Sequence, residues 1–201
     1  MNTERLQADR PQDVARAAAL LREGRIVAFP TETVYGLGAR ADEPSAVAEL
    51  ARMKRRPAGK KFALLIGSPD EARRYAAPGP AALALMRAFW PGPLTLVVPD
   101  GKGGDVGLRC PDHPVALELL RQVGTALAAP SANVSRRPAA TTPPEVLEAF
   151  DGRIAAVLDG GPVEFGVAST VARVLDGEVE ILREGAIPAE ALRSAARLWR
   201  N

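Results

Sequence analysis

Cysteine and histidine are scarce in this 201-residue chain, which contains only Cys110 and His113. A single cysteine cannot form an internal disulfide bond, and two soft side chains are too few for a zinc site. We therefore expect a cytoplasmic protein without a structural metal. His113 directly precedes Pro114 at an expected helix start, where packing or capping is its expected role. The chain thus gives no basis for a Ser-His-Asp or Cys-His enzyme.

Long apolar runs are also missing. Apolar residues make up 47% of the chain but occur in short periodic segments, and the polar residues 1–10 contain no apolar stretch of a secretory signal. We expect neither a membrane span nor a signal peptide. The length suits one full core and no linker-like stretch interrupts it, so we expect a single domain over residues 1–201.

Aromatic residues account for only 4% of the chain, and lysine occurs at four positions. The net charge is +2, yet the sequence pI is about 9.0, because arginine supplies most of the basic side chains. Arginine binds planar anions through two parallel hydrogen bonds. Most single arginines are solvated surface residues, so only their position in a pattern can identify those that bind a ligand.

Helical and extended segments alternate along the chain. Apolar residues at helical spacing predict helices over residues 11–23, 44–57, 80–90, 115–123, 144–150 and 188–199. Short apolar runs predict strands over residues 25–29, 62–66, 94–98, 106–109, 125–129 and 154–158. This alternation is typical of an α/β fold.

The last two strands form a predicted hairpin. Residues 169–175 and 178–183 flank Asp176-Gly177, a strong two-residue turn signal. That turn places Leu175 opposite Glu178 and, by counting outward, Thr170 opposite Arg183, with Ser169 one step beyond. The antiparallel hairpin predicts a mixed sheet, and a register shifted by one residue would turn Arg183 to the other face.

Familiar nucleotide-binding loops are absent. The chain has no Walker A pattern, and Gly36-Leu37-Gly38 lacks the third glycine of a dinucleotide-binding fingerprint. Polar residues instead follow the ends of buried strands, where open α/β sheets bind ligands. They lie in five places, namely residues 29–38, residues 54–61, Arg109, residues 129–135, and residues 166–170 with Arg183. Each place alone has an ordinary structural alternative, such as a Thr- or Asn-stabilised turn, a helix C-terminus or a salt bridge.

Taken together, these segments resemble the threonylcarbamoyl-AMP synthase family, also called YrdC-like, from about residue 22 to 185. The resemblance rests on FPTETVYGLG at 29–38, KRRP at 54–57, WPGPLT at 90–95, R-x-P-x-H-P at 109–114 and APSAN at 129–133. It implies a single-domain, twisted, open mixed sheet flanked by helices, with a large positive cavity. It also implies the short form of the family, without an extra C-terminal domain.

The resemblance further implies a reaction. Its substrates are ATP with Mg²⁺, bicarbonate and L-threonine, and its product serves a tRNA threonylcarbamoyl transferase complex that makes N6-threonylcarbamoyladenosine; direct contact with tRNA is left open. By matching position, Thr31, Arg56 and Ser169 are expected to bind threonine. ATP is assigned to Lys54, Ser131, Asn133 and Arg183. Charge stabilisation is assigned to Lys54, Arg56 and Arg109, and no protein ligand to Mg²⁺ is expected.

Three positions depart from the family pattern. Ala168 stands where the family often has glutamate, Leu65 where longer members often have histidine, and residues 136–139 replace a common Ser-Gly-x-Pro-Ser. Two other functions stay in view. One is a double-stranded RNA or ribosome-binding module that uses the same basic residues without turnover. The other is a carbamoyl-adenylate enzyme of hydrogenase maturation, whose companion domains and zinc cysteines are missing from this sequence.

Overall fold

The computed structural model describes residues 2–56, 60–134, 137–175 and 177–200. Pro57, Ser135, Arg136 and Asp176, which belong to the segments discussed above, lie outside these ranges. Within the described ranges, no helix has both the length and the apolar content needed to cross a membrane.

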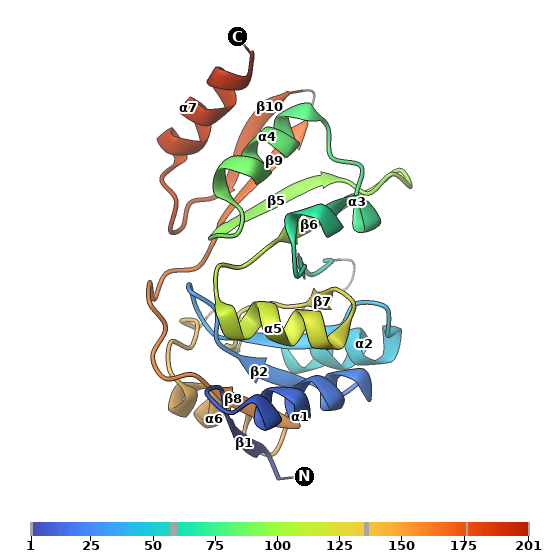
Figure 1. The fold of residues 1–201 in the computed structure, drawn as a ribbon, viewed down its shortest axis with the longest axis vertical. Coiled ribbons are helices and arrows are strands. Elements are labelled where there is room, and N and C mark those ends of the chain that lie inside the picture. Colours follow the sequence, from blue (N-terminus) through green and yellow to red (C-terminus); the bar gives the residue numbers. More distant parts are fainter. Residues whose placement is uncertain (1, 57–59, 135–136, 176, 201) are drawn as a thin grey trace.

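A mixed sheet forms the centre of the molecule (Figure 1). In the described residues its ten strands follow the order β1-β8-β2-β3-β7-β4-β6-β5-β9-β10. Their bounds are β1 Glu4–Gln7, β2 Val27–Phe29, β3 Gly36–Arg40, β4 Leu64–Leu65, β5 Leu94–Pro99, β6 Asp105–Arg109, β7 Leu127–Ala128, β8 Ala156–Asp159, β9 Thr170–Leu175 and β10 Glu178–Arg183. Parallel and antiparallel pairs both occur, which confirms the predicted mixed α/β sheet.

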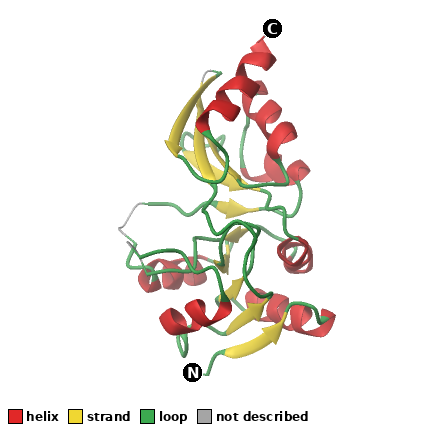
Figure 2. Ribbon diagram, turned by 90° about the vertical axis from the view of Figure 1, so that its left-hand side faces the viewer, coloured by secondary structure: helices red, strands yellow, loops and turns green. Residues whose placement is uncertain are grey.

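Helices cover the two halves of the sheet differently (Figures 1 and 2). Their bounds are α1 Pro11–Arg22, α2 Pro44–Met53, α3 Ala72–Tyr75 with the short turn η1 Pro69–Glu71 before it, α4 Pro80–Phe89, α5 Pro114–Val123, α6 Pro143–Phe150 and α7 Ala189–Arg200. Side chains along β2 alternate between the cluster under α1 and α5 and the cluster under α2 and α6. That half is therefore covered on both faces, whereas α4 and α7 pack on only one face of the β6-β5-β9-β10 half.

The sequence did not predict every element. Strand β1 lies in the polar N-terminal segment, where Thr3 and Leu6 are the buried residues among the described residues 2–10; a parallel pairing with β8 and its place in the strand order make it an edge strand. The polar residues of an edge strand do not carry a long apolar signal. Helix α2 ends at Met53, earlier than expected from Pro57, because Arg55 adopts a left-handed conformation with φ of 50°.

Strand β3 begins within the polar segment 29–38, for which the sequence predicts a ligand site or a turn rather than a strand. Its glycines weaken the strand signal, but it pairs with β2 on one side and β7 on the other. A Cβ atom on Gly38 would lie 2.7 Å from the ring of the buried Phe29 and 3.4 Å from Leu127. Gly38 is therefore required by core packing, while Gly36 lines the cavity described below.

We predict that Gly38→Ala lowers the free energy of unfolding by about 1–3 kcal/mol, the usual cost of overpacking a core. Gly79→Ala is the matched control, because nothing lies within 4 Å of its Cβ position and its φ of −73° suits alanine. There a small loss at the helix N-cap opposes a small gain from a less flexible unfolded chain. Urea unfolding monitored by circular dichroism measures the free energy of unfolding of each variant. Equal stability of the two variants would contradict this packing argument.

Candidate active site

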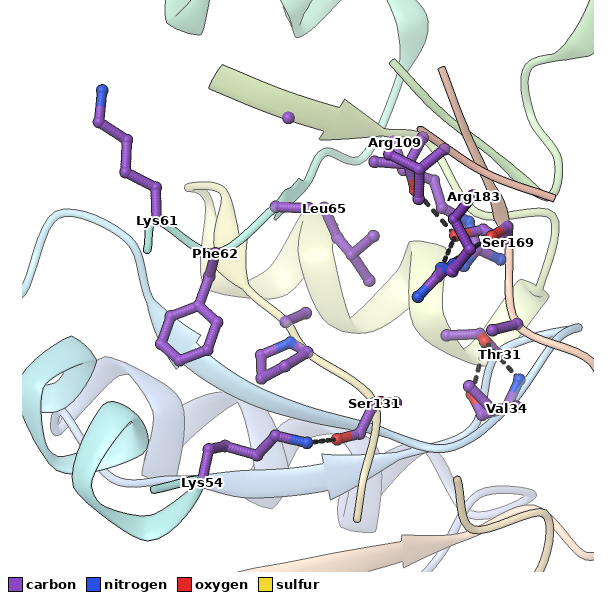
Figure 3. A pocket seen from close by; sticks show the side chains of 18 of the residues that line it. Thr31, Val34, Lys54, Lys61, Phe62, Leu65, Arg109, Ser131, Ser169 and Arg183 are labelled. Carbon is purple, nitrogen blue, oxygen red and sulfur yellow. Dashed lines mark hydrogen bonds between the residues drawn. The ribbon is translucent and has the colours of Figure 1, made fainter. Parts of the chain in front are cut away.

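All eight residues selected from the sequence line one cavity of about 520 Å³. They are Thr31, Lys54, Arg56, Arg109, Ser131, Asn133, Ser169 and Arg183. The cavity lies between the uncovered face of β6, β5 and β9 and the segments that follow β2, α2 and β7 (Figure 3). Residues far apart in the sequence therefore share one site.

Strand alternation provides one wall of the cavity. Along β5, β6 and β9, even-numbered residues such as Leu96, Leu108 and Ala172 enter the core beneath α4 and α7. Their odd-numbered neighbours point to the opposite face. Thr95, Val97, Gly107, Arg109, Ser169 and Val171 consequently line the cavity.

The hairpin register is regular only near the turn. Pairs from Leu175–Glu178 to Ala172–Ile181 follow the prediction, but Arg183 pairs with Val171 rather than with Thr170. The expected Thr170–Arg183 pair is thus wrong, because a β-bulge at Leu182 inserts one extra residue. Thr170 faces the core, so the regular register would have directed Arg183 away from the cavity.

The bulge brings Arg183 and Ser169 into contact (Figure 3). Arg183 Nη2 donates hydrogen bonds to the backbone oxygen of Ser169 at 2.7 Å and to its Oγ at 3.3 Å. The Ser169 hydroxyl also lies 2.9 Å from that of Thr95 on β5. Burial, followed by the nearby charge of Arg109, lowers the pKa of Arg183. Two guanidinium groups therefore lie at this end of the cavity.

Thr31 stabilises the turn that follows β2. Its hydroxyl donates to the backbone oxygen of Val34 at 2.6 Å and accepts the backbone N–H groups of Thr33 and Val34 at 3.3 Å. The side chain is buried and lines the same end of the cavity as Ser169 and Arg183 (Figure 3). Thr31 can therefore stabilise the turn and also face a ligand in the cavity.

Lys54 joins the end of α2 to the loop that follows β7. Its ammonium group donates to the backbone oxygen of Ser131 at 2.5 Å, and to the backbone oxygen and Oδ1 of Asn133, each at 2.7 Å. Ser131 Oγ donates to the same Oδ1 at 2.8 Å. Burial, followed by the charge of Arg56, lowers the pKa of Lys54 to about 8. The buried cation thus fixes the shape of the 131–133 loop.

Arg56 organises the adjacent segment. It donates to the backbone oxygens of Lys60 at 2.8 Å and Lys61 at 2.5 Å, and its guanidinium lies 4.5 Å from the ring centre of Phe62. Stacking on an aromatic face orients a guanidinium group. Lys61 lies at the cavity edge, where it reaches Asp100 at 3.3 Å.

Arg109 forms a buried ion pair. Its Nη2 lies 2.7 Å from Oε1 of Glu32, and the two side chains are 8% and 3% exposed. Its Nε donates to the backbone oxygen of Gly92 at 3.1 Å. The expected anionic partner of Arg109 is therefore, in part, an internal carboxylate. Arg109 therefore forms the salt bridge considered as its structural alternative and also lines the cavity.

Several cavity residues were not selected from the sequence. Thr95 and Val34 lie within motifs that assign them no role, and Phe62 and Val171 show ordinary core patterns. Strand alternation from Leu94 would have placed Thr95 on the cavity face. Two departures from the family pattern, Leu65 and Ala168, line the cavity. Ala139 lies instead in a neighbouring hollow of about 880 Å³.

His113 and Cys110 do not belong to the cavity lining. His113 occupies the N-cap position of α5 without a side-chain cap hydrogen bond, so its expected capping role is wrong and packing remains. Burial lowers its pKa, and burial raises the pKa of the Cys110 thiol to about 12. In the described part of the chain, no group of three or more acidic, histidine or cysteine side chains is arranged to hold a metal ion.

Comparison with known proteins identifies relatives over most of the chain. The sequence profile of the Sua5/YciO/YrdC family, described as telomere recombination, matches residues 19–185. A threonylcarbamoyl-AMP synthase of Bacillus subtilis is 42% identical over 96% of this chain and 58% of its own length. The enzyme of that name from Pyrococcus abyssi is 41% identical over 88% of this chain and 55% of its own.

A solved structure agrees with the fold. Sua5 from Pyrococcus abyssi, crystallised with L-threonine, superposes with a TM-score of 0.90 at 37% identity, covering 97% of this chain and 61% of that one. The chain thus spans between half and two thirds of the length of these relatives. The matched profile, the identities and the shared fold together show that this chain belongs to the Sua5/YciO/YrdC family.

Proposed function

We propose that this chain is a nucleotidyltransferase that makes threonylcarbamoyl-AMP and pyrophosphate from L-threonine, bicarbonate and ATP in the cytoplasm. Its product would serve a tRNA threonylcarbamoyl transferase complex. The observation that carries the proposal is a cavity in which buried hydroxyls and several cationic side chains lie together. Such a lining suits a small polar amino acid next to a polyphosphate.

The two ligands are assigned to different ends of the cavity. Thr31 and Ser169 lie on one side and would contact threonine, whereas Lys54 and Ser131 lie on the other and would contact ATP with Asn133 (Figure 3). Arg183 contacts Ser169, so as an ATP ligand it would mark the point where the two substrates meet. The nearness of Arg56 to Lys54 favours charge neutralisation at phosphate over a threonine contact.

The residues present suit this chemistry. The threonine amine and bicarbonate give a carbamate and water; a carbamate oxygen then attacks the α-phosphorus of ATP, and the bond to pyrophosphate breaks. The attacking group is already an anion and needs no strong protein base. Lys54, Arg56 and Arg109 would hold two anionic substrates together and offset the charge that develops on the phosphate oxygens, with effects of several kcal/mol in a closed site.

Magnesium would come with ATP. Among the described cavity residues Asp105 is the only carboxylate, and it lies 3.7 Å from Arg173. Mg²⁺ commonly keeps several waters and binds substrate phosphates with one or two carboxylates. The donor set fits a magnesium ion that is held mainly by the nucleotide. That ion would screen the negative charge of the phosphates.

We predict that pyrophosphate is released only when ATP, threonine and bicarbonate are all present, because the attacking group is formed from the last two. A coupled pyrophosphate assay with each substrate omitted in turn measures this dependence. Release of ADP and phosphate would contradict the mechanism. Salt-sensitive binding of double-stranded RNA without any nucleotide turnover would favour the alternative binding module.

We further predict that Lys54→Ala and Arg56→Ala each lower turnover at least about tenfold, which corresponds to ~1.4 kcal/mol. Lys54→Ala removes the cation that orders the 131–133 loop, and Arg56→Ala removes the guanidinium stacked on Phe62. Arg22→Ala is the control, because the one hydrogen bond of its side chain to a described residue is to the backbone oxygen of Gln122 at the surface. Equal activity of the three folded variants would place Lys54 and Arg56 outside the working site.

The lowered pKa of Lys54 predicts a pH dependence. Its ammonium group is largely protonated at pH 7 and loses its charge as the pH rises through about 8. ATP affinity, measured without threonine by calorimetry, should therefore fall between pH 7 and 9. Lys54→Arg keeps its charge over this range and should remove the inflection, whatever its absolute affinity. An identical inflection in that variant would assign the titration to another group.

A further inference from the structure

The buried carboxylate of Glu32 lies behind Arg109. Arg109 lines the cavity, whereas Glu32 is outside its lining and only 2% exposed. Glu32 follows β2 and Arg109 ends β6, so the ion pair joins segments 77 residues apart in sequence on the two halves of the sheet.

Arg109 is held by the protein at two nitrogen atoms. Nε donates to the backbone oxygen of Gly92, and Nη2 contacts Glu32. A guanidinium group is planar and has five N–H donors in fixed directions. The hydrogen bond at Nε and the electrostatic attraction of Glu32 at Nη2, which has no hydrogen-bond partner among the described residues, therefore act on one rigid plane, and Nη1 takes part in neither contact.

Among the described residues, Arg109 is the only side chain within ion-pair distance of Glu32. Neither of its carboxylate oxygens has a hydrogen-bond partner among the described residues, although Arg109 lies within ion-pair distance. The carboxylate is located by its backbone, whose oxygen accepts the N–H of Phe165 at 2.9 Å. A buried charge without hydrogen bonds is costly unless an opposite charge compensates it. Replacing a buried ion pair by apolar residues of similar volume is often neutral or stabilising, so stability alone does not require this pair.

The charges at this end of the cavity can then be counted. Arg109 and Arg183 are close enough for the first to lower the pKa of the second, after the larger effect of burial. Glu32 compensates one of these two positive charges. The end near Ser169 therefore keeps an excess of one positive charge, which matches a single carboxylate.

We propose that Glu32 is a positioning residue that acts through Arg109, orienting its guanidinium so that the remaining N–H donors bind the carboxylate of the amino-acid substrate. This inference rests on the proposed function, which supplies that carboxylate. The geometry distinguishes Glu32 from the residues that line the cavity, since its own oxygens reach Arg109 rather than the ligand space.

Glu32→Gln tests the proposal, because it keeps the side-chain shape and removes the charge. We expect the KM for threonine to rise at least tenfold, while ATP affinity measured without threonine changes less than twofold. Turnover at saturating threonine should fall less than threonine affinity. Glu32→Asp keeps the charge but shortens the side chain by one methylene, and should give an intermediate loss of threonine affinity.

Glu118→Gln is the matched control, because it removes the charge from an exposed ion pair in which Glu118 lies 2.6 Å from Arg121. This variant should change the affinity for neither threonine nor ATP. Equal losses for threonine and ATP in Glu32→Gln would indicate a structural role and overturn the proposal. Tighter threonine binding would show that Glu32 only neutralises Arg109, and unchanged binding would show that it does not act on the site; both results overturn it. If Glu32→Gln does not fold, the threonine affinity of Glu32→Asp tests the proposal: a loss for threonine that exceeds the loss for ATP supports it, and equal losses or no loss overturn it.

A second readout separates this inference from the proposed function. In ¹⁵N spectra, the Nε–H signal of Arg109, assigned through Arg109→Lys, should exchange slowly with solvent in the wild-type chain and rapidly in Glu32→Gln. A wild-type chain that releases no threonine-dependent pyrophosphate would reject the proposed function without affecting this signal. An unchanged signal in Glu32→Gln would reject the positioning role even in an active enzyme.

Discussion

The site depends on a half-sheet that is covered by helices on one face only. Leu94, Leu96 and Val98 enter the core under α4 and α7, so Thr95 and Val97 between them must face the other way. The same alternation places Arg109 and Ser169 on that open face. Because the other half of the sheet is covered on both faces, it completes the cavity mainly with the segments that follow its strands, together with Gly36 at the start of β3. A polar pocket is thus formed without interrupting the apolar core.

Most polar groups of the cavity already have partners within the protein. Lys54 holds the 131–133 loop, Arg109 is paired with Glu32, and Arg183 is bonded to Ser169. These contacts restrict the side chains before a ligand binds, which reduces the entropy lost on binding and keeps donors in fixed directions. Each cation has partly exchanged water for protein oxygens, and burial lowers the pKa of Lys54 and Arg183. Such groups respond strongly to an anion that enters the cavity.

The bulge at Leu182 shows how a small irregularity determines which face a side chain uses. A regular hairpin would place Arg183 beside the buried Thr170, yet its guanidinium contacts Ser169 on the cavity face. Thr170 is itself engaged in the core region, donating to the backbone oxygen of Ile187 at 2.6 Å. The extra residue therefore separates a structural threonine from a cavity-facing arginine.

The sequence by itself determined the α/β class, most helices and eight of the residues that line the cavity, because apolar periodicity and motif residues are local properties of the chain. It did not determine strand β1, the strand character of Gly36–Arg40 or the bulge, because each depends on a partner strand that is distant in sequence. It placed Glu32 in a motif but gave it no partner. Only the tertiary structure decided that Glu32 meets Arg109, since the two lie 77 residues apart and are joined by the packing of the two halves of the sheet.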